Sequence, residues 1–199
     1  ALLEVTRVSF NRISVDGDTS TNDTCLVLAN GLAGNPSITS QGADYDAFLE
    51  ALRALCVEMA RRIAADGEGA KHMITCTVEG ATDEAQAERI AKSVISSTLT
   101  KAAIFGADAN WGRVLCAMGY SGEAFDPDKV DVSFISAAGS VAVCAQGRGL
   151  DFDEEAAKRI LTEHDVTIAV AMGEGNGACT CWGCDITYDY IKINGDYRT

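Results

Sequence analysis

The chain has 199 residues, a formal net charge of −13 and 47% hydrophobic residues. The negative charge and the lack of a basic stripe argue against nucleic-acid binding, because a phosphate backbone would be repelled. No apolar run is long enough to span a bilayer and no signal-peptide pattern opens the chain, so we expect no membrane contact and a cytoplasmic location.

The domain organisation follows from length and from the lack of linkers. A chain of this size fits one domain, residues 1–199, or one large subunit of a composite domain. Only two prolines occur and we find no low-complexity tract or internal repeat.

Predicted helices and strands are mixed along the chain. Helices are predicted over residues 1–10, 45–65, 110–118, 153–163 and 186–194, with another that opens at Asp83 and Gln86 as a capping box. Strands are predicted over residues 13–15, 24–29, 72–79, 130–135, 140–145, 166–172 and 178–184. The first helix has no capping residue before it, so we expect it to begin upstream of Ala1. This order predicts a layered α/β or α+β fold rather than a regular βαβ repeat.

The helix over residues 45–65 is amphipathic. Its apolar positions recur at three- and four-residue steps and predict one buried face, which comprises Phe48, Leu49, Leu52, Leu55, Cys56, Met59 and Ile63.

The turn after this helix, Asp66-Gly67-Glu68-Gly69-Ala70-Lys71, holds the first candidate site residue. We expect Gly67 to close the helix with a positive φ. A second glycine lets the backbone beside Glu68 approach a ligand closely, so Glu68 is a candidate acceptor for a substrate amine. The alternative is a solvated acid in an ordinary glycine-rich turn.

The polar block Asp16–Asp23 and the segment Asn110–Arg113 have simpler interpretations. The first lacks the glycine and glutamate that an EF-hand loop needs, so we expect a tight turn held by short side chains. In the second, Asn110 is expected to cap a helix that carries a buried Trp111.

The eight cysteines predict neither a disulfide framework nor a metal site. Five are single residues in apolar segments and are expected to be small buried hydrophobes: Cys25, Cys56, Cys76, Cys116 and Cys144. The cluster Cys179, Cys181 and Cys184 lacks a second ligand pair at zinc-site spacing, and its alternation favours a strand with cysteines on one side.

Four blocks in order resemble one known family. They are Ser9–Ile13 with Asp16–Asp23, then Asp66–Lys71, then Lys101–Gly106 with Asn110–Arg113, and last Cys184–Thr199. Together they resemble the β chain of the bifunctional glutamate N-acetyltransferase of arginine biosynthesis, also called ornithine acetyltransferase, over essentially the whole chain.

The resemblance implies a fold, an activity and partners. The fold is of the N-terminal-nucleophile type, a layered sandwich with helices outside packed sheets, completed by an α chain from the same self-cleaved precursor in an α2β2 heterotetramer. A threonine at the β-chain N-terminus takes acetyl from N-acetylornithine, releases ornithine and passes the acetyl group to glutamate. No cofactor is implied, although many members accept acetyl-CoA as a donor substrate.

The resemblance also assigns site residues. Glu68, Asn194 and Thr199 match positions that contact the amino-acid substrate. Ala1 has no hydroxyl and cannot be the nucleophile, so the catalytic residue is unknown and we expect the opening segment to be missing from this chain.

Two other functions stay open. A related N-terminal-nucleophile amidase or peptidase would hydrolyse its acyl-enzyme instead of passing the acyl group on. A non-catalytic binding homologue would have lost its nucleophile, which Ala1 allows.

Overall fold

The computed structural model describes residues 1–197 as a layered α/β fold built around a seven-stranded sheet. The helices are α1 (Leu2–Arg7), α2 (Ala43–Ala65), α3 (Glu84–Ser96), α4 (Thr98–Phe105), α5 (Trp111–Gly119), α6 (Glu154–Leu161) and α7 (Tyr188–Asp196), with 3-10 turns η1 (Phe10–Arg12) and η2 (Pro127–Lys129). The strands are β1 (Ile13–Ser14), β2 (Met73–Ala81), β3 (Asp131–Ser136), β4 (Gly139–Ala145), β5 (Arg148–Gly149), β6 (Asp165–Ala171) and β7 (Gly177–Cys184). In this described part of the chain, no helix is both long and apolar enough to cross a membrane.

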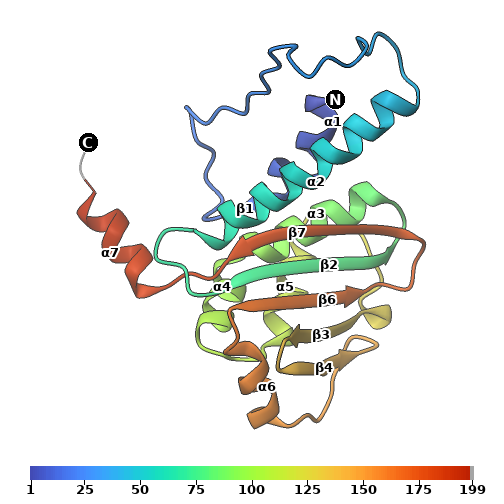
Figure 1. Ribbon diagram of the computed structural model, residues 1–199. Coiled ribbons are helices and arrows are strands. Elements are labelled where there is room, and N and C mark those ends of the chain that lie inside the picture. The colour runs from blue at the N-terminus through green and yellow to red at the C-terminus, as the bar shows by residue number, and fades with distance from the viewer. Residues whose placement is uncertain (198–199) are drawn as a thin grey trace.

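The sheet brings the first and last strands of the chain together. Its order is β1-β7-β2-β6-β3-β4-β5 (Figure 1). β1 runs parallel to β7, whereas β2 runs antiparallel to β7 and parallel to β6. Because of these directions, the loop after β1, the turn before β2 and the segment after β7 all lie at one end of the sheet.

One face of the sheet carries the main core. Ile74, Cys76 and Val78 alternate along β2 and are fully buried against the layer of α3, α5 and α6. The predicted cap of α3 is confirmed, since an Asp83 side-chain oxygen accepts a hydrogen bond of 2.8 Å from the Gln86 backbone N–H. Period-two burial on the strands and a capped amphipathic helix therefore explain this layer.

The other face of the sheet is only partly covered. Within the described residues, no helix lies in front of β2, β6 and β3, as Figure 1 shows. Many side chains on this face are small or polar and half-buried, among them Thr75, Thr77, Ser133, Thr167 and Ala169, and the large residue Ile135 is 39% exposed there. This composition differs from that of the core face on the same strands.

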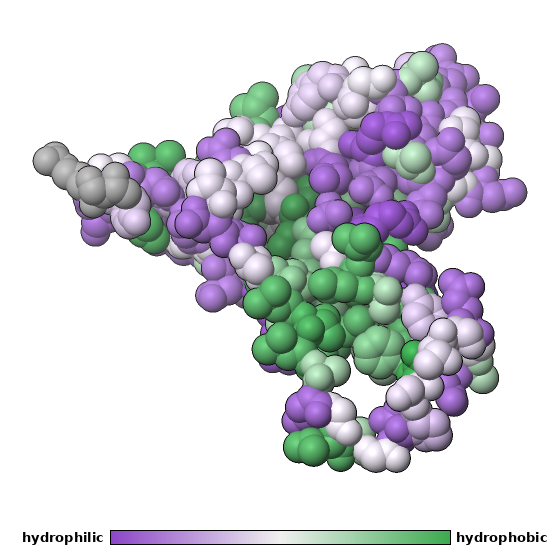
Figure 2. Space-filling view, turned by 90° about the horizontal axis from the view of Figure 1, so that it is seen from above, coloured by the Kyte–Doolittle hydropathy of each residue, from purple (hydrophilic) through white to green (hydrophobic). Residues whose placement is uncertain are grey.

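The predicted single buried face of α2 is wrong in part. The residues that α2 fully buries are Cys56, Ala60 and Ala64, and Leu49 and Leu52 are half-buried. The rest of the predicted face is 44–56% exposed and forms what we call the α2 stripe, comprising Phe48, Leu55, Met59 and Ile63. At 100° per residue, this stripe lies roughly a quarter turn from the side that contacts β7 and β1. Figure 2 shows a hydrophobic area over this part of the molecule, bordered by the segment that arches between β1 and α2.

That arching segment also accounts for a wrong strand prediction. Residues 24–29 form no strand in the described chain, and Leu28 is 91% exposed. Cys25, like Cys116, is exposed rather than buried, which corrects the expectation for these two cysteines. An apolar β-prone run forms a strand only where a neighbouring strand is available to pair with it.

Helix α4 was not predicted. It follows α3 directly, and Ser97 caps it by accepting a hydrogen bond of 3.2 Å from the Thr100 backbone N–H. The last helix begins at Tyr188 rather than at residue 186, because Thr187 serves as its cap. The remaining predicted elements are present, with bounds that differ by a few residues.

Candidate functional site

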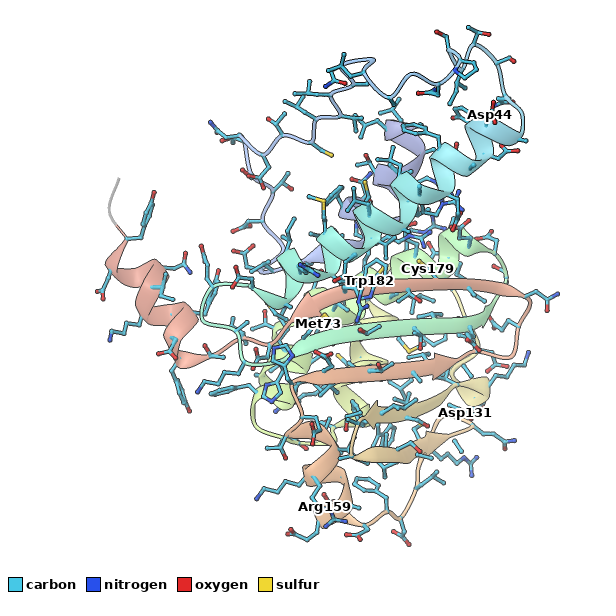
Figure 3. All side chains as sticks on the ribbon, viewed as in Figure 1. Asp44, Met73, Asp131, Arg159, Cys179 and Trp182 are labelled. Atoms are coloured by element: carbon cyan, nitrogen blue, oxygen red, sulfur yellow. The ribbon has the colours of Figure 1, made fainter. Side chains whose placement is uncertain are left out.

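Three segments meet at the end of the sheet marked by Met73, the first residue of β2 (Figure 3). They are the loop after β1, the turn after α2, and α7. A cavity of about 490 Å³ lies between the first two. Its lining includes the carboxylates of Asp16, Asp18, Asp23, Asp66 and Glu68 and, among the described residues, no lysine or arginine. The cavity therefore favours a cationic group over an anionic one.

The two glycines of the turn after α2 have exchanged the roles that we expected. Gly67 does not have a positive φ, and a Cβ there would lie 2.5 Å from the Cys184 Sγ. Gly69 has a φ of +69°, and a Cβ there would lie 2.9 Å from the Tyr190 backbone nitrogen. Gly67 is thus required by packing against β7, and Gly69 by its backbone conformation and by the approach of α7.

Glu68 and Asn194 come together across 126 residues of sequence. The Asn194 Nδ2 donates a hydrogen bond of 2.7 Å to Glu68 Oε2 and one of 3.1 Å to the Tyr190 carbonyl oxygen. Both side chains are exposed at the surface beside the cavity. Thr199 lies outside the described residues. That these three residues bind substrate remains a prediction.

Asp16 and Tyr190 form a second contact between the same segments. The Tyr190 hydroxyl donates a hydrogen bond of 3.0 Å to Asp16 Oδ2. Burial and the neighbouring Asp16 carboxylate raise the pKa of Tyr190 to about 12, so its hydroxyl is protonated at neutral pH. The other Asp16 oxygen accepts from the Asp18 backbone N–H at 2.9 Å, as expected for a tight turn. The partnership with Tyr190 was not anticipated from sequence.

Asp185 fixes the start of α7 to the beginning of β2. Its buried carboxylate accepts hydrogen bonds from the Lys71 N–H at 2.8 Å and the His72 N–H at 3.1 Å, and it lies 2.7 Å from His72 Nδ1. Burial alone would raise the pKa of Asp185, but these hydrogen bonds outweigh it and hold the pKa below the ordinary value. Two residues later, Thr187 Oγ1 donates a hydrogen bond of 2.7 Å to the Gly69 carbonyl oxygen.

Lys101 lies beneath the site and is almost fully buried. Its ammonium donates hydrogen bonds to the carbonyl oxygens of Val15, at 2.6 Å, and of Cys184. Burial lowers its pKa, and the nearby Cys184, Asp185 and Asp16 counteract that effect only in part. Lys101 therefore joins the ends of β1 and β7, from which two walls of the site extend.

The cysteine-rich segment forms strand β7, as predicted. Cys179 and Cys181 lie on β7, with Cys181 opposite Cys76 of β2, and all three belong to the core. Burial raises the pKa of the Cys76 thiol. Among residues 1–197, no three His, Cys, Asp or Glu side chains are grouped as a metal site would require.

The predicted cap at Asn110 is also present, away from this site. The Asn110 Oδ1 accepts a hydrogen bond of 3.1 Å from the Arg113 backbone N–H. Trp111 is half-buried against the core, and Arg113 Nη1 donates to the Leu99 carbonyl oxygen at 3.0 Å. Arg113 thus binds the main chain within the helical layer rather than the acidic cavity.

Comparison with known proteins gives a consistent picture. The chain is 53% identical over 199 residues to arginine biosynthesis bifunctional protein ArgJ 1 of Clostridium acetobutylicum, covering 100% of this chain and 49% of the relative. It is 52% identical to the bifunctional ArgJ of Symbiobacterium thermophilum, covering 100% of this chain and 48% of that protein. The chain therefore spans about half the length of these curated relatives.

A solved structure supports the fold assignment. The crystal structure of arginine biosynthesis bifunctional protein ArgJ from Bacillus halodurans matches with a TM-score of 0.92 and 44% identity, covering 98% of this chain and 91% of that one. The layered α/β fold predicted from sequence is thereby confirmed. The model of the ArgJ family matches residues 1–199, and the chain belongs to the ArgJ family.

Proposed function

We propose that this chain is the β chain of a glutamate N-acetyltransferase that transfers acetyl from N-acetylornithine to glutamate, with acetyl-CoA as an alternative donor, in the cytoplasm. The observation that carries the proposal is the Glu68–Asn194 pair beside an acidic cavity in a chain of this family. An amino-acid substrate presents an ammonium group, for which this lining is suited.

Each polar group of the pair has a definite role in the proposal. Both N–H groups of the Asn194 side chain are used, one by Glu68 and one by the Tyr190 carbonyl oxygen. The amide oxygen of Asn194 and the Glu68 carboxylate remain as acceptors for a substrate ammonium. Thr199 is proposed to add its hydroxyl to the same subsite.

The chemistry is acyl transfer in two steps. A threonine hydroxyl attacks the acetyl carbonyl of N-acetylornithine, and collapse of the tetrahedral intermediate expels the ornithine amine with a proton and leaves an acetyl ester. The glutamate amine then attacks this ester, which forms N-acetylglutamate and regenerates the hydroxyl. We propose that the threonine precedes Ala1 in the whole protein and that the α chain supplies donors to the oxyanion.

The proposed α chain has surfaces to bind. The sheet face on β2, β6 and β3 lacks a covering helix in the described chain, and the α2 stripe is exposed. An exposed apolar area of this kind is typical of an obligate interface. Together with relatives about twice as long, this supports a partner α chain, and we propose that the two chains assemble as an α2β2 heterotetramer.

The test uses the full-length gene and the substitution Glu68→Gln. We expect the KM for N-acetylornithine to rise about tenfold or more, because a charged hydrogen bond contributes roughly 1.5–3 kcal/mol. The matched control is Glu163→Gln, an exposed acid beside α6. Unchanged kinetics in Glu68→Gln would contradict the assigned role, and acetyl transfer to water but not to glutamate would favour an amidase.

A further inference from the structure

Helix α7 is attached to the rest of the chain through one polar stripe. Thr187, Tyr190 and Asn194 have the spacing of a single helical face, and they bind Gly69, Asp16 and Glu68 through hydrogen bonds of 2.7, 3.0 and 2.7 Å. Within its described range, Tyr188–Asp196, the helix has no fully buried residue. Figure 1 shows it projecting from the body of the molecule.

Apolar packing contributes little to the rotation of α7 about its axis, because its aromatic contact, between the rings of Tyr188 and Phe105, leaves Tyr188 mostly exposed. Tyr188 and Ile191, which lie off the polar stripe, are 82% and 64% exposed. A hydrogen bond contributes about 0.5–1.5 kcal/mol, so each of the three contacts is a large share of what orients the helix. A change at one contact is expected to affect the next.

Tyr190 is the middle contact and is linked to Asn194 in two ways. Asn194 follows it by one helical turn, and Asn194 Nδ2 donates to the Tyr190 carbonyl oxygen at 3.1 Å. A rotation that releases Tyr190 from Asp16 would thus carry Asn194 away from Glu68. Asp16 is itself held in place, because its carboxylate binds the Asp18 N–H and Lys101 binds the carbonyl of the preceding Val15.

We propose that Tyr190 and Asp16 are positioning residues that orient α7 so that Asn194 and Glu68 together receive the amino-acid substrate. This inference rests on the proposed function and adds two residues to it. They act through Asn194 and Glu68 and are not proposed to touch the reacting atoms.

The test compares Tyr190→Phe with Tyr188→Phe in the complete enzyme. Tyr190→Phe removes only the hydroxyl, and we expect the KM for N-acetylornithine to rise about three- to tenfold with kcat changed less than about twofold. Tyr188→Phe keeps the ring that packs edge-on against Phe105, with ring centroids 5.4 Å apart, and its KM should equal that of the parent enzyme. Equal KM values in the two variants would overturn the proposal.

Substitutions at Asp16 separate the hydrogen bond from the charge. Asp16→Asn removes the charge but keeps an amide that can donate to the Tyr190 oxygen, so we expect it to raise the KM less than Asp16→Ala does. Asp16→Ala should raise the KM at least as much as Tyr190→Phe does, and adding Tyr190→Phe to it should raise the KM no further. Additive effects of Asp16→Ala and Tyr190→Phe would contradict a shared role.

Two experiments complete the test: a double-mutant cycle that combines Tyr190→Phe with Asn194→Ala, and a measurement of amide hydrogen exchange, which does not depend on catalysis. Tyr190→Phe should have little further effect on KM in the Asn194→Ala background, and it should speed amide hydrogen exchange in α7. If Glu68→Gln and Asn194→Ala leave KM unchanged, the proposed function fails. If they raise KM and Tyr190→Phe changes neither KM nor exchange, only the positioning role fails.

Discussion

The Lys101 ammonium donates a hydrogen bond of 2.6 Å to the Val15 carbonyl oxygen, which links α4 to the residue immediately before Asp16. The same ammonium binds the Cys184 carbonyl oxygen, immediately before Asp185. Burial of a lysine that is 2% exposed is costly unless its ammonium is hydrogen-bonded, and the other donor to the Val15 oxygen is the weak Cys184 thiol at 3.8 Å. The buried Lys101 ammonium therefore connects the ends of β1 and β7. The loop that contains Asp16 follows β1, and the segment that leads into α7 follows β7.

Replacing Lys101 with methionine tests this link. The substitution retains most of the side-chain volume but removes the ammonium that donates to the carbonyl oxygens of Val15 and Cys184, and a buried acceptor that is left unsatisfied costs about 1–3 kcal/mol. We expect the melting temperature of the complete protein to fall by at least about 4 °C. Lys158→Met, at an exposed position of α6, is the control. Equal melting temperatures for the two variants would show that Lys101 has no such role.

The buried Asp185 predicts an acid-sensitive step in stability. Because its pKa in the folded chain lies below the ordinary 3.8, the carboxylate stabilises the fold above that pH, and this contribution is lost as pH falls through the folded value. Asp185→Asn should lower stability at neutral pH and flatten its decline below pH 3.8. Urea unfolding as a function of pH measures both effects. Parallel curves for the parent and the variant would contradict the prediction.

Gly69 and Gly122 allow backbone strain to be separated from steric contact. Both have positive φ, +69° and +85°, but a Cβ would lie 2.9 Å from the Tyr190 nitrogen at Gly69 and meets nothing within 4 Å at Gly122. Gly122→Ala should therefore cost only about 1–2 kcal/mol of unfolding free energy. Gly69→Ala should cost more and should also displace α7. Denaturant unfolding compares the two, and equal costs would show that α7 yields freely to the added methyl group.

The helical layer and the central strands could be predicted because their signals are local. The Asp83–Gln86 cap and the alternation of Ile74, Cys76 and Val78 each lie within a few residues of sequence. The two-residue repeat of apolar side chains identifies such a strand, and the capping residues identify the start of such a helix. The α2 stripe could not be recognised as exposed, because a hydrophobic arc does not reveal which part of it the sheet covers.

The contacts of the site are not local. Asp16 and Tyr190 are separated by 174 residues, and each has an ordinary local interpretation, as a turn residue and as a helical aromatic residue. Glu68 was singled out by its double-glycine turn and Asn194 through family resemblance, and their proximity depends on the start of β2 lying beside the end of β7. Sheet order, which short patterns do not encode, decides which loops meet.

The last prediction concerns the α2 stripe as a binding surface for the proposed α chain. Leu55 is 56% exposed, so Leu55→Asp removes little packing from this chain and should leave its fold intact. Placing a charge in an apolar interface should nevertheless prevent assembly, because an unpaired carboxylate would have to be desolvated. We therefore expect the variant, expressed from the full-length gene, to lose co-purification of the two chains and, with it, acetyl transfer.

The matched control for this experiment is Ala54→Asp, one residue earlier on α2. Ala54 is exposed but lies on the polar side of the helix, near Glu58 and Arg61, so the same charge there should leave assembly unchanged. Circular dichroism of both variants distinguishes loss of assembly from loss of folding. Normal co-purification of the chains in Leu55→Asp, with the helix intact, would mean that the α2 stripe faces solvent in the assembled protein and that the partner binds elsewhere, with the open face of β2, β6 and β3 as the next surface to test.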